Sequence, residues 1–321
     1  MSYHFLMDLA LILLSTKILG LVAQKFQMPQ VVGALIAGLI LSPAGLGLLS
    51  ETEFTAQLSE LGVIVLMFSA GMGTDIKELK NSGKAGFMVA VLGVVVPFLM
   101  GTALAWGADE LGLIETTGFL ESIFIGTILT ATSVSITVET LKEMKKLETK
   151  VGNTILAAAL IDDVLGLVAL TLVCSLAGGD ESIGMVLLKI AGFFVFAFVV
   201  GFAANRVFCW MLKRQHGWAS HRNSVFAFVL CLVMAYCAEE FFGVADITGA
   251  YAAGLAVACT PKGTYIQTKY NPLGYLLLTP VFFASIGINV QITGLTGGML
   301  AFSLLLLLIS IISKLLGCGL G

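Results

Sequence analysis

The sequence predicts an all-α polytopic membrane protein, and three observations support this fold class. Hydrophobic residues make up 58% of the 321 residues and charged residues only 12%, which is more apolar surface than a water-soluble domain can bury. The apolar residues gather into long continuous stretches, and the charges between these stretches alternate in sign along the chain. Stretches of this length are typical of membrane-spanning helices and exclude barrel strands, in which polar and apolar residues alternate.

Most of the stretches have close to the roughly 20 residues that a helix needs to cross a bilayer. The predicted spans are 5–24, 29–48, 57–74, 84–107, 119–141, 150–177, 182–212, 223–242, 246–260, 273–290 and 297–321. The ninth span is short. Because lipid offers no hydrogen-bond partners, each segment has to satisfy its own backbone groups, which favours helices throughout.

The charges between the spans predict how the chain is oriented. Basic residues occupy alternate connections, represented by Lys25, Lys84, Lys145, Arg222 and Lys269, whereas the connections between them carry acids or no charge. Since cytoplasmic connections are enriched in lysine and arginine, the N-terminus is expected outside a cell inner (plasma) membrane. The first span lacks a basic leader and a cleavage site, so it is expected to remain as a permanent helix.

Two parts of the sequence resemble one another at a constant offset. Residues 33–39 and 249–255 share five of seven amino acids at an offset of 216 (249 minus 33). The same offset places Ser69 on Ser285 and Gly71 on Gly287. Small residues also recur by chance in membrane helices. However, one offset serves two separate pairs of spans, and a shift of seven helices inverts the topology. We therefore predict an inverted repeat, which in secondary transporters surrounds a site near the bilayer midplane.

Charged residues deep in the predicted spans are candidates for function, because a charge in lipid is costly. The deepest are Lys17, Asp162, Asp163 and Lys314, while Lys189 and Glu139 lie nearer the ends of their spans. Lys17 and Lys189 are equally well explained as side chains that reach the membrane surface. Lys314 is expected to meet an aspartate, although it also has the option of extending to the cytoplasmic interface.

The adjacent pair Asp162 and Asp163 gives the strongest signal. Asp162 lies about 18 Å along a helix that begins at Lys150, close to mid-bilayer. Neighbouring helical side chains point about 100° apart, so the two carboxylates are expected to have different roles. One would face a water-filled cavity and bind either a proton or a small cation, and the other would be held by a fixed positive partner. The alternative is two acids that only pair with lysines.

Residues 130–137 precede the aspartate span and are rich in hydroxyl groups, with Thr130, Thr132 and Ser133 among them. These hydroxyls can bond back to carbonyls of their own helix. Their position favours a broken helix, whose freed carbonyls and hydroxyls would line an ion site. The chain has no Walker motif, and the aspartate pair lacks the third acid of a magnesium-diphosphate site, so neither an ATP-driven pump nor an enzyme is predicted.

Several segments together resemble a known family. Residues 159–166 (Ala-Leu-Ile-Asp-Asp-Val-Leu-Gly), 130–133 (Thr-Ala-Thr-Ser), 280–283 (Pro-Val-Phe-Phe) and 313–317 (Ser-Lys-Leu-Leu-Gly) are similar to the sodium/proton antiporters of the monovalent cation:proton antiporter superfamily, of the NapA and NhaA type. The resemblance extends over the whole chain in order. It implies an inverted-repeat fold of thirteen helices, with an ion-translocation core domain and a dimerisation domain.

The resemblance also implies roles and domain boundaries. Asp163 would carry the transported sodium, lithium or proton, Asp162 would contact it and pair with Lys314, and Thr132 and Ser133 would lie at the helix crossing. Residues 1–56 and 223–260 would form the dimerisation domain of a homodimer and 182–212 a linker helix. The first and second core repeats would be 57–177 and 273–321. No cofactor is expected besides the transported ions, and no nucleic acid.

One departure from the family leaves alternatives open. Under the 216-residue offset the fifth and sixth spans should recur beyond Gly321, so the chain would lack the last two of the thirteen helices. The leading prediction is exchange of sodium or lithium for protons. The alternatives are a truncated or non-transporting membrane protein that retains the dimer interface, and a potassium/proton antiporter.

Overall fold

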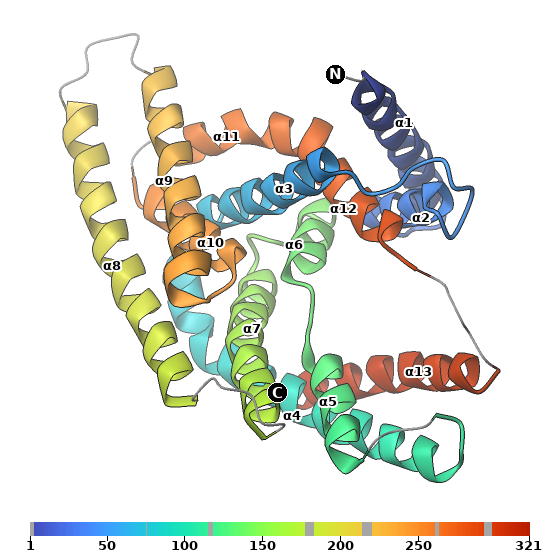
Figure 1. The fold of residues 1–321 in the computed structure, drawn as a ribbon. Coiled ribbons are helices and arrows are strands. Elements are labelled where there is room, and N and C mark those ends of the chain that lie inside the picture. Colours follow the sequence, from blue (N-terminus) through green and yellow to red (C-terminus); the bar gives the residue numbers. More distant parts are fainter. Residues whose placement is uncertain are drawn as a thin grey trace. The chain divides into compact units, whose positions relative to one another are not determined.

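The computed structural model describes residues 3–74, 76–114, 118–176, 183–213, 220–260, 263–291 and 297–321, and within these ranges the chain forms helices joined by turns and short extended segments, with no strand (Figure 1). The predicted all-α fold class is therefore confirmed. The elements are α1 (His4–Lys25), α2 (Gln30–Leu41), α3 (Glu53–Met72), α4 (Ile76–Glu110), α5 (Phe119–Thr130), α6 (Val134–Glu143), α7 (Lys150–Leu176), α8 (Ile183–Lys213), α9 (Ser220–Phe242), α10 (Asp246–Ala258), α11 (Gly263–Leu273), the π-helix η1 (Gly274–Leu278), α12 (Thr279–Ile288) and α13 (Gly297–Leu320).

Among the described residues, nine helical segments are long and apolar enough to cross a membrane. The spans predicted at 29–48 and 246–260 are shorter than this, because α2 has 12 residues and α10 has 13. Twelve residues of α-helix cover only about 18 Å of a hydrocarbon core about 30 Å thick. The prediction for 29–48 was too long because Pro43 follows Ser42, which has an extended backbone (φ −62°, ψ 166°) and so ends α2.

The chain divides into two compact units, each built from several separate segments. Unit 1 comprises Met1–Asp75, Ser135–Glu148 and Phe193–Ile292, and unit 2 comprises Ile76–Val134, Thr149–Gly192 and Thr293–Gly321. Residues 57–74 and 273–290 thus belong to the same unit as the segments that the sequence assigns to dimerisation. The functional names of the predicted domains remain predictions.

Within unit 1, two helix crossings depend on glycine. A Cβ atom added to Gly38 of α2 would overlap the Ala284 carbonyl of α12, and one added to Gly287 of α12 would overlap α2 in return. Gly71 of α3 and Gly254 of α10 face one another in the same way. The 216-residue offset relates Gly38 to Gly254 and Gly71 to Gly287. The crossing of Gly38 with Gly287 is therefore equivalent to the crossing of Gly254 with Gly71. This relation supports the inverted repeat, which remains a prediction.

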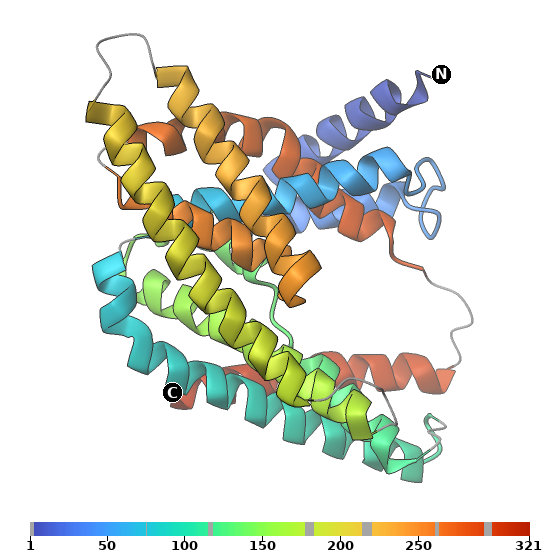
Figure 2. The ribbon, with the colours of Figure 1, turned by 60° about the vertical axis from the view of Figure 1, so that its left-hand side comes forward.

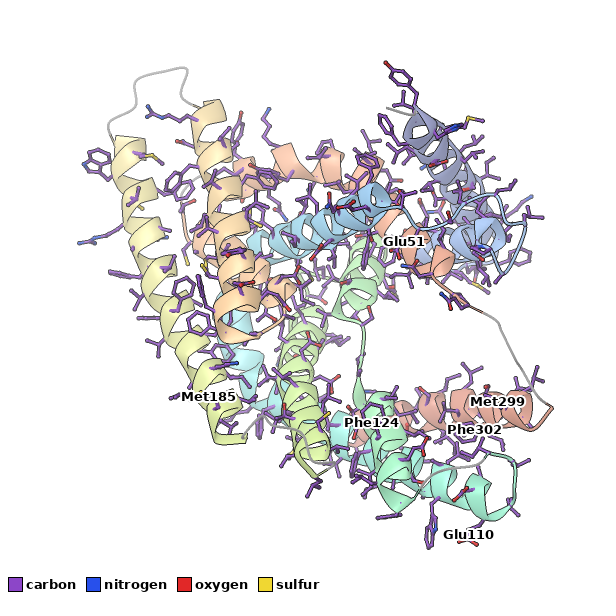
Figure 3. The ribbon with its side chains drawn as sticks, in the orientation of Figure 1. Glu51, Glu110, Phe124, Met185, Met299 and Phe302 are labelled. Atoms are coloured by element: carbon purple, nitrogen blue, oxygen red, sulfur yellow. The ribbon has the colours of Figure 1, made fainter. Side chains whose placement is uncertain are left out.

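The start of α3 is fixed by local hydrogen bonds and by a contact to α12. The Thr52 hydroxyl accepts a hydrogen bond from the Thr55 backbone N–H at 3.2 Å, and the Thr55 hydroxyl accepts one from Thr52 N–H at 2.9 Å. This reciprocal cap satisfies two N–H groups that a helix start leaves without partners. Just before it, Glu51, labelled in Figure 3, accepts a hydrogen bond from the Asn289 side-chain amide at 2.6 Å.

In unit 2 the long helix α4 contacts α5, α7 and α13 (Figure 2). The closest approaches are again at glycines. A Cβ atom on Gly126 of α5 would overlap the Thr102 hydroxyl of α4, and one on Gly317 of α13 would overlap the Leu92 carbonyl of α4. Because α13 packs so closely on α4, a lysine one turn before Gly317 comes within reach of α4 backbone atoms.

Candidate ion-binding site

The helix that precedes the aspartate helix is broken. α5 ends at Thr130, α6 begins at Val134, and residues 131–133 are not helical; Ala131 is extended (φ −63°, ψ 132°). The break leaves the carbonyl of Thr130 at a helix end, where no N–H four residues later can bond it. The Thr130 hydroxyl bonds back to the Thr127 carbonyl of its own helix at 2.7 Å. For this residue the alternative role of the hydroxyls, bonding to their own helix rather than lining an ion site, is therefore observed.

A second free carbonyl comes from the interior of α4. Pro97 lies inside this helix, and proline has no N–H to donate to the carbonyl four residues earlier. That carbonyl belongs to Gly93. The proline therefore leaves a backbone oxygen of α4 available to another donor in the middle of a predicted span.

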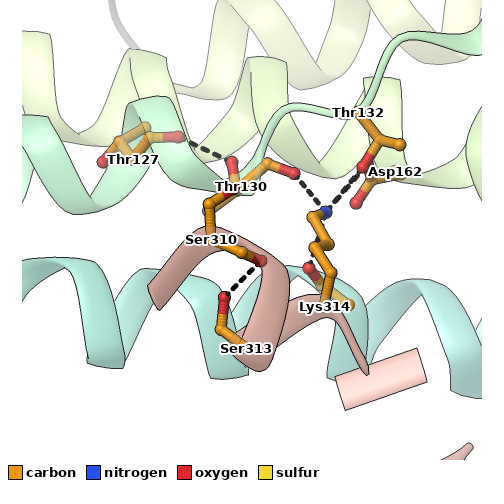
Figure 4. Close-up of polar contacts among 8 residues, drawn as sticks. Thr127, Thr130, Thr132, Asp162, Ser310, Ser313 and Lys314 are labelled. Atoms are coloured by element: carbon orange, nitrogen blue, oxygen red, sulfur yellow. Dashed lines mark hydrogen bonds and ion pairs between the residues drawn. The ribbon is translucent and has the colours of Figure 1, made fainter. Parts of the chain in front are cut away.

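Both freed carbonyls are bound by Lys314 of α13. Its ammonium group donates to Gly93 O at 2.9 Å, to Thr130 O at 2.6 Å and to the Thr132 hydroxyl at 2.6 Å (Figure 4). An ammonium group has three N–H donors, so each is matched by one oxygen. Three separate elements of unit 2, namely α4, the α5–α6 break and α13, are tied together by this one side chain.

Asp162 lies beside this ammonium group without a hydrogen bond to it. Its Oδ2 is 3.6 Å from Lys314 Nζ, which is too long for a hydrogen bond but close enough for strong attraction in apolar surroundings. The residue is 6% exposed, and both of its carboxylate oxygens are buried without a hydrogen-bond partner among the described residues. Asp162 is therefore balanced mainly by charge, since the donors of Lys314 are used elsewhere.

Asp163 is half-buried, and in the part of the chain that the structure describes one of its carboxylate oxygens is buried without a hydrogen-bond partner. It is one residue along α7 from Asp162, so its side chain points about 100° away around the helix. Ser133, also predicted to belong to the site, is exposed in the break of α5 and α6. The structure thus groups Lys314, Thr132 and Asp162 by direct contact, whereas among the described residues no ion pair joins Asp163 to Lys314.

A resident metal ion would need a larger set of ligands. In the ranges that the structure describes, no group of three or more His, Cys, Asp or Glu side chains could hold a metal ion. A pair of carboxylates with nearby hydroxyl and carbonyl oxygens instead suits a small hard cation that binds and leaves.

Sequence reasoning did not identify Gly93 or Pro97 as parts of this site. A signal was present, because a proline inside a predicted span marks the residue four positions earlier as a carbonyl without its helical partner. What the sequence lacked was the information that α13 brings Lys314 to that carbonyl.

Comparison with known proteins gives consistent results. Residues 10–320 match the family described as sodium/hydrogen exchanger, transmembrane. The chain is 36% identical to the Na(+)/H(+)-K(+) antiporter GerN of Bacillus cereus, covering 100% of this chain and 80% of that protein. It is 39% identical to the probable Na(+)/H(+) antiporter GerT of Bacillus cereus, with 99% and 82% covered.

Solved structures show the same fold at lower sequence identity. The sodium proton antiporter MjNhaP1 of Methanocaldococcus jannaschii superimposes with a TM-score of 0.68 and 18% identity, covering 97% of this chain and 76% of that one. At this identity the likeness concerns the fold alone.

Proposed function

Because this chain belongs to the sodium/hydrogen exchanger family of membrane antiporters, we propose that it exchanges sodium or lithium for protons by competition at Asp163. The observation that carries the proposal is the arrangement around α7: one aspartate faces a fixed ammonium group, and its neighbour keeps a buried carboxylate oxygen without a partner. Such an oxygen in apolar surroundings is stabilised by binding either a cation or a proton.

The charges of the site support a competition for one position. Asp162 and Asp163 contribute −2 and Lys314 contributes +1, which leaves −1 (−2 plus +1) for a mobile ion to neutralise. One proton or one monovalent cation balances this charge, but both together exceed it. The carboxylate would bind either ion before the site moves from one side of the membrane to the other. Without a bound ion, the uncompensated charge would make this movement through the membrane too unfavourable.

Lys314 would couple the two aspartates. A cation on Asp163 also attracts Asp162, and so competes with Lys314 for that carboxylate. The 3.6 Å separation without a hydrogen bond makes the Asp162–Lys314 interaction easier to disturb than a direct bonded pair. Thr132 and Ser133 would add hydroxyl oxygens to the shell of a small cation, and sodium is the first expectation because hard oxygens surround the site.

The proposal also covers the membrane location and the oligomeric state, whereas the identity of the transported cation has to be measured. The chain would lie in a cell inner membrane with its N-terminus outside, as a homodimer, and would need no cofactor besides the transported ions. Potassium is the main alternative cation, since one relative is described as a Na(+)/H(+)-K(+) antiporter. Parallel assays with sodium, lithium and potassium would separate these options.

The direct test replaces Asp163 with asparagine in purified protein reconstituted into liposomes. The wild-type chain is expected to move protons when sodium is added, and Asp163→Asn is expected to abolish this movement while the protein still inserts and remains monodisperse. Glu240→Gln is the matched control, because Glu240 is an exposed acid at the end of α9. Exchange that persists in Asp163→Asn would overturn the proposed mechanism, and a wild-type chain without exchange would support the non-transporting alternative.

A further inference from the structure

Unit 1 contains a cavity with several polar groups in its lining, which the exchange mechanism does not use. It has a volume of about 300 Å³ and is formed by α1, α2, α6, η1 and α12. Its apolar lining includes Leu13, Val31 and Phe283, and its polar lining includes two carboxylates and one ammonium group. An apolar pocket with a few convergent polar groups is the usual form of a small-ligand site.

The two carboxylates belong to Glu139 and Glu143, one helical turn apart on the same face of α6. Glu139 is only 5% exposed, and within the described ranges its Oε2 has no hydrogen-bond partner. This oxygen forms a long ion pair with Lys142, whose Nζ lies 3.9 Å away on a side chain that is 36% exposed. Glu143 accepts a hydrogen bond from Gln30 N–H at 2.7 Å. A buried glutamate that lines a cavity and has a carboxylate oxygen without a hydrogen-bond donor points to a ligand that the protein does not itself supply.

The cation that lines the cavity bonds to another lining residue rather than to a glutamate. Lys17 donates a hydrogen bond to the Tyr275 hydroxyl at 3.1 Å and lies 5.2 Å from the centre of that ring. In the described part of the chain, no ion pair joins Lys17 to either glutamate. The residues that line the cavity, two glutamates and Lys17, sum to a charge of −1 (−2 plus +1). Lys142 forms an ion pair with Glu139 at 3.9 Å but does not line the cavity, and its side chain is 36% exposed. Because solvent screens this pair, one monovalent cation would still be needed to balance the lining.

The other polar groups of the lining indicate what kind of cation fits. They are the hydroxyls of Thr16, Thr279 and Tyr275 and the side-chain amide of Gln30. All offer hard oxygen atoms, and no histidine or cysteine lines the cavity, which favours alkali cations over transition metals. Tyr275 lies in the π-helix η1, and π-helical turns are frequent at functional sites.

We infer that this cavity is a second binding site for a monovalent alkali cation, with Glu139 and Glu143 as its charged ligands. The inference stands apart from the aspartate pair, because the cavity and its ligands all belong to unit 1 whereas the aspartates belong to unit 2. Lys17 would oppose the bound cation, so the charge of this one side chain sets how strongly the cavity binds.

Equilibrium binding of radioactive ²²Na⁺ to purified protein tests the inference. The wild-type chain is expected to bind two ions, and Asp163→Asn is expected to retain one. In the Asp163→Asn background, Glu139→Gln should weaken the remaining binding at least about tenfold, as loss of a contacting charge in apolar surroundings implies. Lys17→Gln should strengthen it, and Glu240→Gln should leave it unchanged. Glu143→Gln serves as a second loss variant, and far-UV circular dichroism verifies that every variant is folded.

Each outcome separates this inference from the proposed function. Binding that disappears completely with Asp163→Asn would overturn the cavity site and leave the aspartate mechanism standing. Binding that depends on Glu139 but not on Asp163 would support the cavity and contradict the aspartate mechanism. Retained binding that is insensitive to Glu139, Glu143 and Lys17 would also overturn the cavity site, whichever residue holds the ion.

Discussion

Replacing Pro97 with alanine tests how the site holds Lys314. Alanine supplies the backbone N–H that proline lacks, so the Gly93 carbonyl regains a helical donor. This donor competes with the ammonium group of Lys314, which lies 2.9 Å from the same oxygen. The helix also straightens where the proline disturbed it, which draws the carbonyl back toward the helix axis.

The expected effects on stability and on activity have opposite signs. A hydrogen bond to a charged group contributes about 1.5–3 kcal/mol, against about 0.5–1.5 kcal/mol for a neutral one. Weakening one of the three bonds of Lys314 should therefore cost the site on the order of 1–2 kcal/mol, or a factor of roughly 5–30. In contrast, the helix interior should gain from the loss of proline, which is disfavoured there by up to about 3 kcal/mol relative to alanine.

The assay measures thermal unfolding and sodium-driven proton movement on the same reconstituted sample. For Pro97→Ala we expect an unchanged or higher melting temperature together with a roughly 5–30-fold slower exchange. Pro272→Ala in α11 is the matched control, because Pro272 is also inside a helix but contributes nothing to Lys314. Full exchange activity in Pro97→Ala would refute the argument that the freed carbonyl positions Lys314.

Three further predictions concern the charge, the topology and the packing. Lys314→Gln should leave cation binding in place but slow sodium-driven proton movement, because Asp162 loses the fixed charge that balances it, and an unaltered exchange rate would show that Lys314 does not couple the ions. Single cysteines introduced beside Lys145 and beside Asp109, with the native cysteines replaced, should react with impermeant reagents from opposite sides of the membrane; labelling from one side would contradict the predicted orientation. Gly71→Ala should lower stability by about 1–3 kcal/mol, because its Cβ would overlap the Tyr251 carbonyl. Gly83→Ala, whose Cβ would meet no atom within 4 Å, should not lower the melting temperature.

The features that the sequence predicted well depend on properties carried by short stretches of chain. Long apolar runs specify membrane helices because the cost of placing polar groups in lipid is local. The break before Val134 was predictable for a similar reason, since clustered hydroxyls compete with helical hydrogen bonds. Deep charges such as Asp162 and Lys314 stand out from the sequence alone, because each is unfavourable without a partner.

The features that the sequence missed depend on which helices pack together. The acceptors of Lys314 could not be identified before α13 was placed against α4, although Pro97 marked the Gly93 carbonyl as free. Lys17 was equally compatible with a surface position or a functional one. Only the structure brings it to Tyr275 beside the cavity that Glu139 lines. Burial of Glu139 likewise follows from its neighbours, since it lies near the end of its span.

The glycine crossings of unit 1 have a mechanical consequence. Where Gly38 meets Gly287, the two backbones touch directly, and sliding either helix by one residue would drive a side chain into the opposing carbonyl. The helices can pivot slightly about such a point, but they cannot ratchet past one another. The crossing of Gly71 and Gly254 pins a second pair in the same way. We therefore expect α2, α3, α10 and α12 to act as a stiff frame in which each crossing keeps its register, so that any movement carries the two helices of a crossing together.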